Sequence, residues 1–198
     1  MIFEPLSHEY GGYIFDCDGT LADSMVVHYR AWLAALAAHG ATFDFNWDLF
    51  ISRAGMTLPN TVRELNAQFG LALDPEAVTS SQRLEYERYL STVQPIAEVV
   101  EFALRVAASR PVSVASGGER KVVRRTLELI GLGQIFPVVI TAEDVTHGKP
   151  APDMFLLAAE RMGVTPADCV VFEDSVLGIE AAKRAGMASV LVRPPNVR

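Results

Sequence analysis

The chain of 198 residues lacks the features that mark several classes of protein. It has two cysteines, Cys17 and Cys169, and both fall inside apolar stretches, so we expect buried free thiols rather than a disulfide. Its formal net charge of -7 argues against nonspecific nucleic-acid binding, because such binding neutralises phosphates with lysine and arginine. No apolar run approaches the ~18 residues that span a bilayer, so we expect no membrane partner.

The N-terminal ten residues lack the basic segment and the following apolar segment of a secretory signal. We therefore expect a cytoplasmic protein, present as a monomer or a weak dimer. The chain has no internal repeat and no low-complexity tract. Half of its composition is hydrophobic, which suffices for one sizeable core and a small second lobe.

The hydrophobic periodicity changes character along the chain. Residues 12–15 form a short apolar run, which is typical of a buried strand, and the pattern from residue 25 to about residue 94 is helical. After Pro95, short apolar runs alternate with helical segments. The expected strands are residues 112–115, 138–141, 169–172 and 189–192, and the expected helices are residues 96–107, 119–130, 151–162 and 176–185.

This alternation predicts a parallel sheet that is covered by helices on both faces. We therefore predict an α/β fold with a doubly wound, Rossmann-like core made of residues 1–23 and 95–198. The helical residues 24–94 are predicted to form a cap domain, inserted directly after the first strand and its acidic loop.

Four polar motifs follow four of the predicted strands, where open parallel sheets bind their ligands. Each motif alone is ordinary, since it reads as a turn, a loop, a helix start or a solvated acidic pair. Together they supply a nucleophile, an acid/base, phosphate anchors and carboxylates for a divalent metal, which is the inventory of a phosphoryl-transfer enzyme. The motifs are residues 16–20 (DCDGT), 116–118 (SGG), 149–150 (KP) and 173–174 (ED).

Longer segments around these motifs carry a family resemblance. They are residues 15–24 (FDCDGTLADS), 115–118 (ASGG), 147–153 (HGKPAPD) and 172–179 (FEDSVLGI). With them the chain resembles the haloacid dehalogenase superfamily of aspartate-nucleophile phosphotransferases, in the subgroup with a helical cap after the first motif. The resemblance is closest to the beta-phosphoglucomutase and sugar-phosphatase branch, and it is weaker in the cap.

The resemblance and the chemistry imply the same catalytic roles. Asp16 is expected to attack phosphorus and become an aspartyl-phosphate, while Asp18 serves as the general acid and then the general base. A Mg²⁺ ion is implied, because a carboxylate and a phosphate cannot approach closely without a cation between them. Its expected ligands are Asp16, the Asp18 main-chain carbonyl, Asp174 and, directly or through water, Glu173.

The resemblance also implies a phosphate-binding set. Ser116, the Gly117 N–H and Lys149 are expected to hold the transferring phosphoryl oxygens. Lys149 is one of three lysines in a chain that otherwise uses arginine, which favours a requirement for a compact charge at this position.

The cap supplies three further candidates, Ser24, His28 and Arg53. Ser24 faces either the end of a cap helix or the substrate. A lone helical histidine is usually structural. His28, however, lies one turn beyond Ser24, and related mutases have a histidine at the matching spacing. We therefore expect it to approach the substrate or to couple cap closure to the acid/base.

The cap sequence also separates the possible activities. Asp18 argues against a dehalogenase, and residues 24–94 contain no lysine for an imine mechanism. A beta-phosphoglucomutase would show a lysine and an arginine where this chain has Ala54 and Leu58, although Arg53 is adjacent. We therefore predict a Mg²⁺-dependent phosphoric monoester hydrolase that acts on a small sugar phosphate similar to fructose 1-phosphate.

Two alternatives stay open. The first is a phosphosugar mutase of the beta-phosphoglucomutase type. The second is an inactive relative that binds phosphate or a partner, which predicts the loss of at least one core motif residue, and none is lost.

Overall fold

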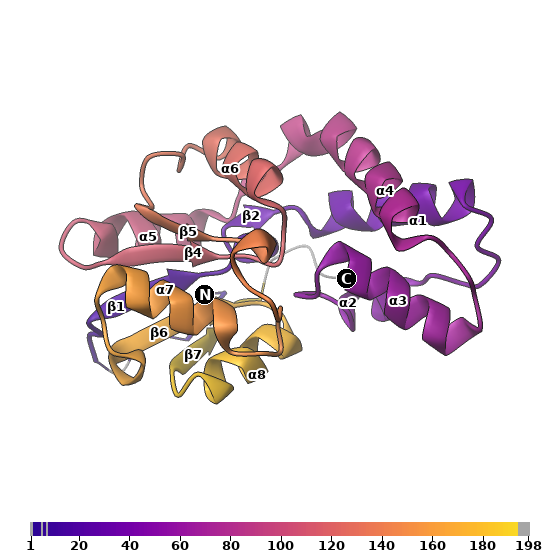
Figure 1. Cartoon of the computed structure of the whole chain (residues 1–198). Coiled ribbons are helices and arrows are strands. Elements are labelled where there is room, and N and C mark those ends of the chain that lie inside the picture. The colour runs from indigo at the N-terminus through magenta and orange to yellow at the C-terminus, as the bar shows by residue number, and fades with distance from the viewer. Residues whose placement is uncertain (1, 5, 7, 194–198) are drawn as a thin grey trace.

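The computed structural model describes residues 2–4, 6 and 8–193, and it contains a five-stranded sheet beside a separate group of helices (Figure 1). All neighbouring strands of this sheet are parallel. The order is β5-β4-β1-β6-β7, which puts β1 at the centre and confirms the predicted doubly wound α/β fold. The strands are β5 (Val138–Ile140), β4 (Val112–Ala115), β1 (Gly12–Phe15), β6 (Cys169–Glu173) and β7 (Ala188–Leu191).

The strands are short apolar runs because both faces of the sheet are buried. Phe15 and Phe172 point into one core, which also contains residues of α5 (Ala97–Ala107) and α6 (Arg120–Leu129). Ile14 and Val171 point into a second core with residues of α7 (Asp153–Met162) and α8 (Val176–Arg184). Successive side chains of each strand therefore pack against the helix layers on opposite faces of the sheet.

Four helices between β2 and β3 form the second lobe (Figure 1). It has an apolar core of its own, with Trp32, Phe50 and Leu65 among its buried residues. Helices α1 and α4 pack along each other, and α3 packs on α4. The helices are α1 (Met25–Ala38), α2 (Trp47–Ile51), α3 (Leu58–Phe69) and α4 (Pro75–Tyr89).

The two crossings between the lobes lie side by side. β2 (Ala22–Asp23) and β3 (Gln94–Pro95) pair antiparallel, and the Ile96 N–H donates to the Leu21 carbonyl over 2.9 Å just beyond this pair. The small ribbon holds together the points where the chain leaves and re-enters the sheet domain. Three short 3-10 helices, η1 (Leu90–Thr92), η2 (Ala142–Asp144) and η3 (Pro166–Asp168), complete the chain.

The structure differs from the sequence prediction at a few boundaries. Helix α7 begins at Asp153 rather than at residue 151, with Pro152 preceding its first turn. Within the described residues, none of the helices combines the length and the apolar composition that a membrane crossing requires.

Candidate active site

Asp16 stands at the point where the central strand β1 ends. Its N–H donates to the Phe172 carbonyl of β6 over 2.9 Å, so the residue is still held by the sheet. The loop then turns at Gly19, whose φ of +86° lies in the left-handed region. A Cβ at Gly19 would lie 2.2 Å from an Asp174 carboxylate oxygen. A larger residue at this turn would therefore displace Asp174.

Lys149 joins two of the motifs through its ammonium group. Nζ lies 2.6 Å from Asp16 Oδ1 and 2.7 Å from Glu173 Oε2. Lys149, Asp16 and Glu173 are 3%, 5% and 1% exposed, so this is a buried, charge-assisted network. Burial alone would lower the Lys149 pKa, but the two carboxylates raise it, so the ammonium stays charged.

Three carboxylates converge at this end of the sheet. Asp16, Glu173 and Asp174 each offer an oxygen, and these oxygens lie within 4.8 Å of one another. Burial, reinforced by the charge of Glu173, raises the pKa of Asp16 and of Asp174. Two buried carboxylates and the partly buried Asp174 face one ammonium, so carboxylates outnumber cations in the cluster. Its all-oxygen donor set fits a hard divalent cation.

Glu173 is oriented by the first turn of α8. The Ser175 hydroxyl donates to Glu173 Oε1 over 2.5 Å and accepts from the Gly178 N–H over 3.0 Å. A Cβ at Gly178 would lie 2.0 Å from the Glu173 carboxyl carbon, so this helix position needs a glycine. Ser175 was not predicted as a site residue, although its place directly after the Glu-Asp motif and before a helix is an N-cap signal.

Ser116 and the two glycines after it form the neighbouring loop. The Ser116 N–H donates to the Ile140 carbonyl of β5 over 3.0 Å, and its hydroxyl accepts from the Gly118 N–H over 3.1 Å. A Cβ at Gly117 would lie 2.9 Å from the Gly55 carbonyl oxygen of the helical lobe. The two lobes therefore meet at this loop, backbone against backbone.

Asp18 is held by two residues of the helical lobe. The Ser24 hydroxyl donates to Asp18 Oδ1 over 2.6 Å, and His28 Nε2 lies 3.1 Å from the same oxygen. Although burial alone would raise the Asp18 pKa, His28 and Ser24 hold it below its usual value. Asp18 therefore favours the carboxylate form.

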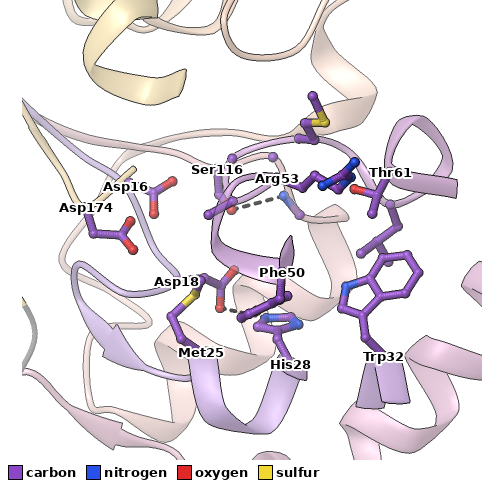
Figure 2. A pocket seen from close by; sticks show the side chains of 16 residues that line it. Asp16, Asp18, Met25, His28, Trp32, Phe50, Arg53, Thr61, Ser116 and Asp174 are labelled. Atoms are coloured by element: carbon purple, nitrogen blue, oxygen red, sulfur yellow. Dashed lines mark hydrogen bonds and ion pairs between the residues drawn. The ribbon is translucent and has the colours of Figure 1, made fainter. Parts of the chain in front are cut away.

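Both lobes line one pocket above these groups (Figure 2). Asp16 and Asp174 lie at one end, and Trp32 and Thr61 lie at the other. The helical lobe contributes a mostly apolar wall. Its lining side chains include Met25, Trp32, Phe50, Met56 and Leu58.

Arg53 also lines the pocket, but its guanidinium is bound within the helical lobe. Nη1 donates to the Leu49 carbonyl over 3.1 Å and to the Ser52 hydroxyl over 2.9 Å, and Nη2 donates to Gln68. Partial burial lowers the Arg53 pKa. These contacts engage Nη1 and Nη2, whereas the buried Nε–H has no hydrogen-bond partner among the described residues.

The structure brings the predicted site residues to a single place. Those of the sheet domain surround the end of β1, and Ser24 and His28 reach the same place through Asp18. Arg53 lies farther along the pocket wall (Figure 2). The sheet-domain set is Asp16, Asp18, Ser116, Gly117, Lys149, Glu173 and Asp174.

Comparison with known proteins gives a family match over most of the chain. A family model described as haloacid dehalogenase-like hydrolase matches residues 10–186. This range includes four of the five strands of the sheet, the helical lobe and every residue of the candidate site.

Individual relatives are similar over both lobes. The fructose-1-phosphate phosphatase YqaB of Escherichia coli (strain K12) is 38% identical over 187 residues, covering 93% of this chain and 97% of that protein. The putative phosphatase YhcW of Bacillus subtilis (strain 168) is 36% identical, covering 92% and 82%. A crystal structure of a hydrolase from Pseudomonas syringae is 26% identical with a TM-score of 0.83, covering 90% and 83%.

Proposed function

The chain belongs to the haloacid dehalogenase-like hydrolases and is a phosphatase, and we propose that it hydrolyses a small sugar-phosphate monoester with Mg²⁺ and an aspartyl-phosphate intermediate. One observation carries the proposal. A buried network joins Asp16, Lys149 and Glu173. Asp16 also lines a pocket, together with Asp18 and Asp174, and the opposite wall of this pocket belongs to the helical lobe. We assign residues 24–94 to a cap and the remainder to the catalytic core.

In the first step, an oxygen of Asp16 attacks phosphorus. A bond forms between this oxygen and phosphorus, and the bond from phosphorus to the sugar oxygen breaks. Asp18 first takes up a proton from solvent, and it gives this proton to the leaving oxygen as it departs. Both residues line the pocket, so one bound ester can contact both carboxyl groups.

In the second step, water attacks the phosphorus of the aspartyl-phosphate, and Asp16 leaves as a carboxylate. Asp18, now ionised, accepts the proton of this water. The contacts from Ser24 and His28, which lower the Asp18 pKa, support this role as a base. The products are inorganic phosphate and the free sugar.

The carboxylate cluster is assigned to Mg²⁺, with Asp16, Asp174, Glu173 and the Asp18 carbonyl as candidate ligands. The ion supplies positive charge between the nucleophile and the phosphoryl oxygens. The raised pKa values of Asp16 and Asp174 support this assignment, because burial and the nearby charge of Glu173 both disfavour their carboxylate forms, and a bound cation would favour them.

Phosphate binding is assigned to Ser116, Gly117 and Lys149. The charged Lys149 ammonium lies against Asp16, so it can neutralise a phosphoryl oxygen next to the nucleophile. Glu173 holds the same ammonium from its other side, which fixes its position.

The cap wall supports a substrate with one phosphate and an uncharged remainder. Ala54 and Leu58 are uncharged, and the guanidinium of Arg53 is bound to neighbouring cap groups. A second phosphate at this end of the pocket would compete with these neutral cap groups for the Arg53 guanidinium. The fructose-1-phosphate phosphatase at 38% identity supports the same class.

A phosphate-release assay with Mg²⁺ tests this function. The panel contains fructose 1-phosphate, other hexose and pentose monophosphates, and beta-glucose 1-phosphate with and without a bisphosphate primer. We expect stoichiometric phosphate release from at least one sugar monophosphate, and negligible formation of glucose 6-phosphate. The Asp16→Asn protein, purified in parallel, controls for a contaminating phosphatase.

Two results would contradict the proposal. Primed isomerisation of beta-glucose 1-phosphate that outpaces phosphate release would establish the mutase instead. Binding of sugar phosphates without any turnover would favour an inactive relative.

A further inference from the structure

Gln82 is a polar residue that the proposed mechanism does not use, yet it is buried in the cap at 1% exposure. It lies in α4, which packs along α1, the helix that carries His28. Gln82 Nε2 lies 3.3 Å from His28 Nδ1. His28 Nε2, on the other side of the ring, lies 3.1 Å from Asp18 Oδ1. A continuous line of two contacts thus joins α4 to the acid/base.

The imidazole of His28 is also held in its plane. It stacks on the ring of Tyr86, with centroids 3.9 Å apart and an angle of 12° between the planes. Tyr86 follows Gln82 by four residues, so both side chains leave α4 on the same face. The helix therefore fixes the ring by its plane and by one of its nitrogens.

A neutral imidazole carries a hydrogen on one nitrogen and a bare lone pair on the other. An amide NH₂ group can only donate, so the nitrogen that faces it must be bare. An ionised carboxylate can only accept, so the nitrogen that faces Asp18 must carry the hydrogen. Both neighbours of His28 thus match the same tautomer, with the hydrogen on Nε2.

We propose that Gln82 is a positioning residue, which selects the Nε2–H tautomer of His28 and thereby makes His28 a donor to Asp18. This inference rests on the proposed role of Asp18 in proton transfer. In the opposite tautomer, a bare Nε2 would face the Asp18 carboxylate, and the Gln82 amide would have to turn over to present its oxygen to the Nδ1–H.

The contact between His28 and Asp18 determines which oxygen of Asp18 remains available for proton transfer. Ser24 and His28 both hold Oδ1. The other oxygen, Oδ2, lies 3.8 Å from the place that a Cβ on Gly118 would occupy, beside the proposed phosphate loop. Loss of the His28 donor frees the carboxylate to rotate, so proton transfer slows while substrate binding is retained.

The tautomer can be read directly by ¹⁵N NMR of the histidine ring, at a pH where the ring signals show a neutral imidazole. The His28 signals are assigned by their absence from the His28→Gln spectrum. We expect Nε2 protonated and Nδ1 bare in the unaltered protein. Gln82→Met, of similar length but without the donor, should give a mixture of tautomers. Gln82→Glu, with an acceptor in place of the donor, should give a ring with a hydrogen on both nitrogens, because a carboxylate then faces each of them.

Kinetics on the same proteins separates positioning from packing. Gln82→Met should lower kcat about five- to tenfold, the equivalent of one hydrogen bond, while KM changes less than about twofold. Gln82→Glu should lower kcat further. Thr79→Val is the matched control, since Thr79 is a buried polar residue of α4 whose hydroxyl donates to the Glu76 carbonyl and is remote from His28. It should leave kcat and the tautomer unchanged.

Either of two results overturns the inference. One is an unaltered Nε2–H tautomer in Gln82→Met. The other is a fall in kcat that follows thermal stability alone and occurs equally in Thr79→Val. A failure of the proposed phosphatase function would look different, because the ring spectrum is recorded without substrate and does not depend on turnover.

Discussion

The two walls of the pocket differ in the polarity of their side chains. The core wall consists of buried charges that bind one another directly, as Asp16, Lys149 and Glu173 do. The cap wall consists mainly of aromatic and aliphatic side chains, and its arginine is bound to neutral groups of the cap. This difference assigns bond breaking to the core and substrate selection to the cap. Changes in the core should therefore act on kcat, and changes in the cap should act mainly on KM.

The contacts that join the two lobes are of a third kind, since they include ion pairs that are accessible to water. Two ion pairs, Arg83 with Glu119 and Lys121 with Glu87, link α4 to the beginning of α6. Ion pairs that are accessible to water contribute about 0–1 kcal/mol each. The ribbon of β2 and β3 keeps the lobes joined. These weak contacts suit a cap that must open for substrate and close again.

The largest effect is expected at the nucleophile. Asp16→Asn keeps the shape of the side chain but removes its ability to attack phosphorus, so kcat should fall at least ~10³-fold. The amide also relieves part of the buried negative charge, so the melting temperature should not fall by more than a few degrees. Steady-state phosphate release and thermal melting measure both quantities. Near-normal turnover would show that Asp16 is not the nucleophile, and the division between the walls would fail.

Metal removal is the second test of the core wall. Exhaustive chelation should abolish turnover, and Mg²⁺ should restore it. Mg²⁺ at about a hundredfold excess over its Kd should also stabilise the fold by about 2–3 kcal/mol, read as a rise in melting temperature. This rise should be lost in Asp174→Asn and kept in Trp32→Phe. Ca²⁺ should bind but inhibit, because its looser coordination permits a non-attacking carboxylate pose. Full activity after chelation would exclude a metal in the reaction.

The contrast between the walls also explains what the sequence could predict. Lys149 and Asp16 are 133 positions apart, yet their proximity followed from the rule that parallel strands end at one edge. Gln82 and His28 are 54 positions apart on two cap helices, and their contact depends on how those helices dock. Helix periodicity gives the buried face of each helix, but it does not give their mutual rotation and offset.

Short elements were missed for a related reason. Helix α2 has five residues, and β2 and β3 have two each, so none is long enough to show a period. The N-cap position of Ser175 can be recognised in the sequence. Its hydrogen bond to Glu173 cannot, because that bond depends on the side-chain geometry of the turn. The motif residues could be predicted, as could Ser24 and His28 as candidates near Asp18, whereas the supporting residues Ser175 and Gln82 could not.

A substitution of Trp32 tests the role of the cap wall, and we expect a moderate effect on KM. It lies opposite Asp16 and Asp174, and among the described residues no hydrogen bond from its indole N–H is found (Figure 2). We expect this N–H to donate to a sugar hydroxyl. Trp32→Phe keeps an aromatic ring but removes the donor, so KM should rise about fivefold with kcat changed less than about twofold. The matched control is Trp47→Phe. Trp47 is the other tryptophan of the chain and does not line the pocket, so this change should alter neither KM nor kcat. A fall in kcat for Trp32→Phe at constant KM would break the division between the walls.

The smallest effect concerns a core carboxylate away from the pocket. Asp144 accepts from the Thr141 N–H and hydroxyl over 2.9 and 3.0 Å, and it pairs with Arg120 and Arg161. Although burial alone would raise its pKa, these bonds hold the pKa at about 2. A pKa below the unfolded value of about 3.9 means that the stabilisation is complete above that pH and is lost as the pH falls toward 2.

Asp144→Asn should therefore lower the free energy of unfolding by about 1 kcal/mol at neutral pH, with kcat changed less than about twofold. The difference from the unaltered protein should narrow between about pH 4 and pH 2, because the native carboxyl group then becomes protonated too. Denaturant unfolding at a series of pH values measures it. Glu85→Gln, in an exposed cap pair with Arg88, is the matched control and should change stability by less than about 0.5 kcal/mol at every pH. Equal, pH-independent losses in both variants would mean that the hydrogen-bonded Asp144 network of the core contributes no more to the fold than the Glu85–Arg88 pair of the cap.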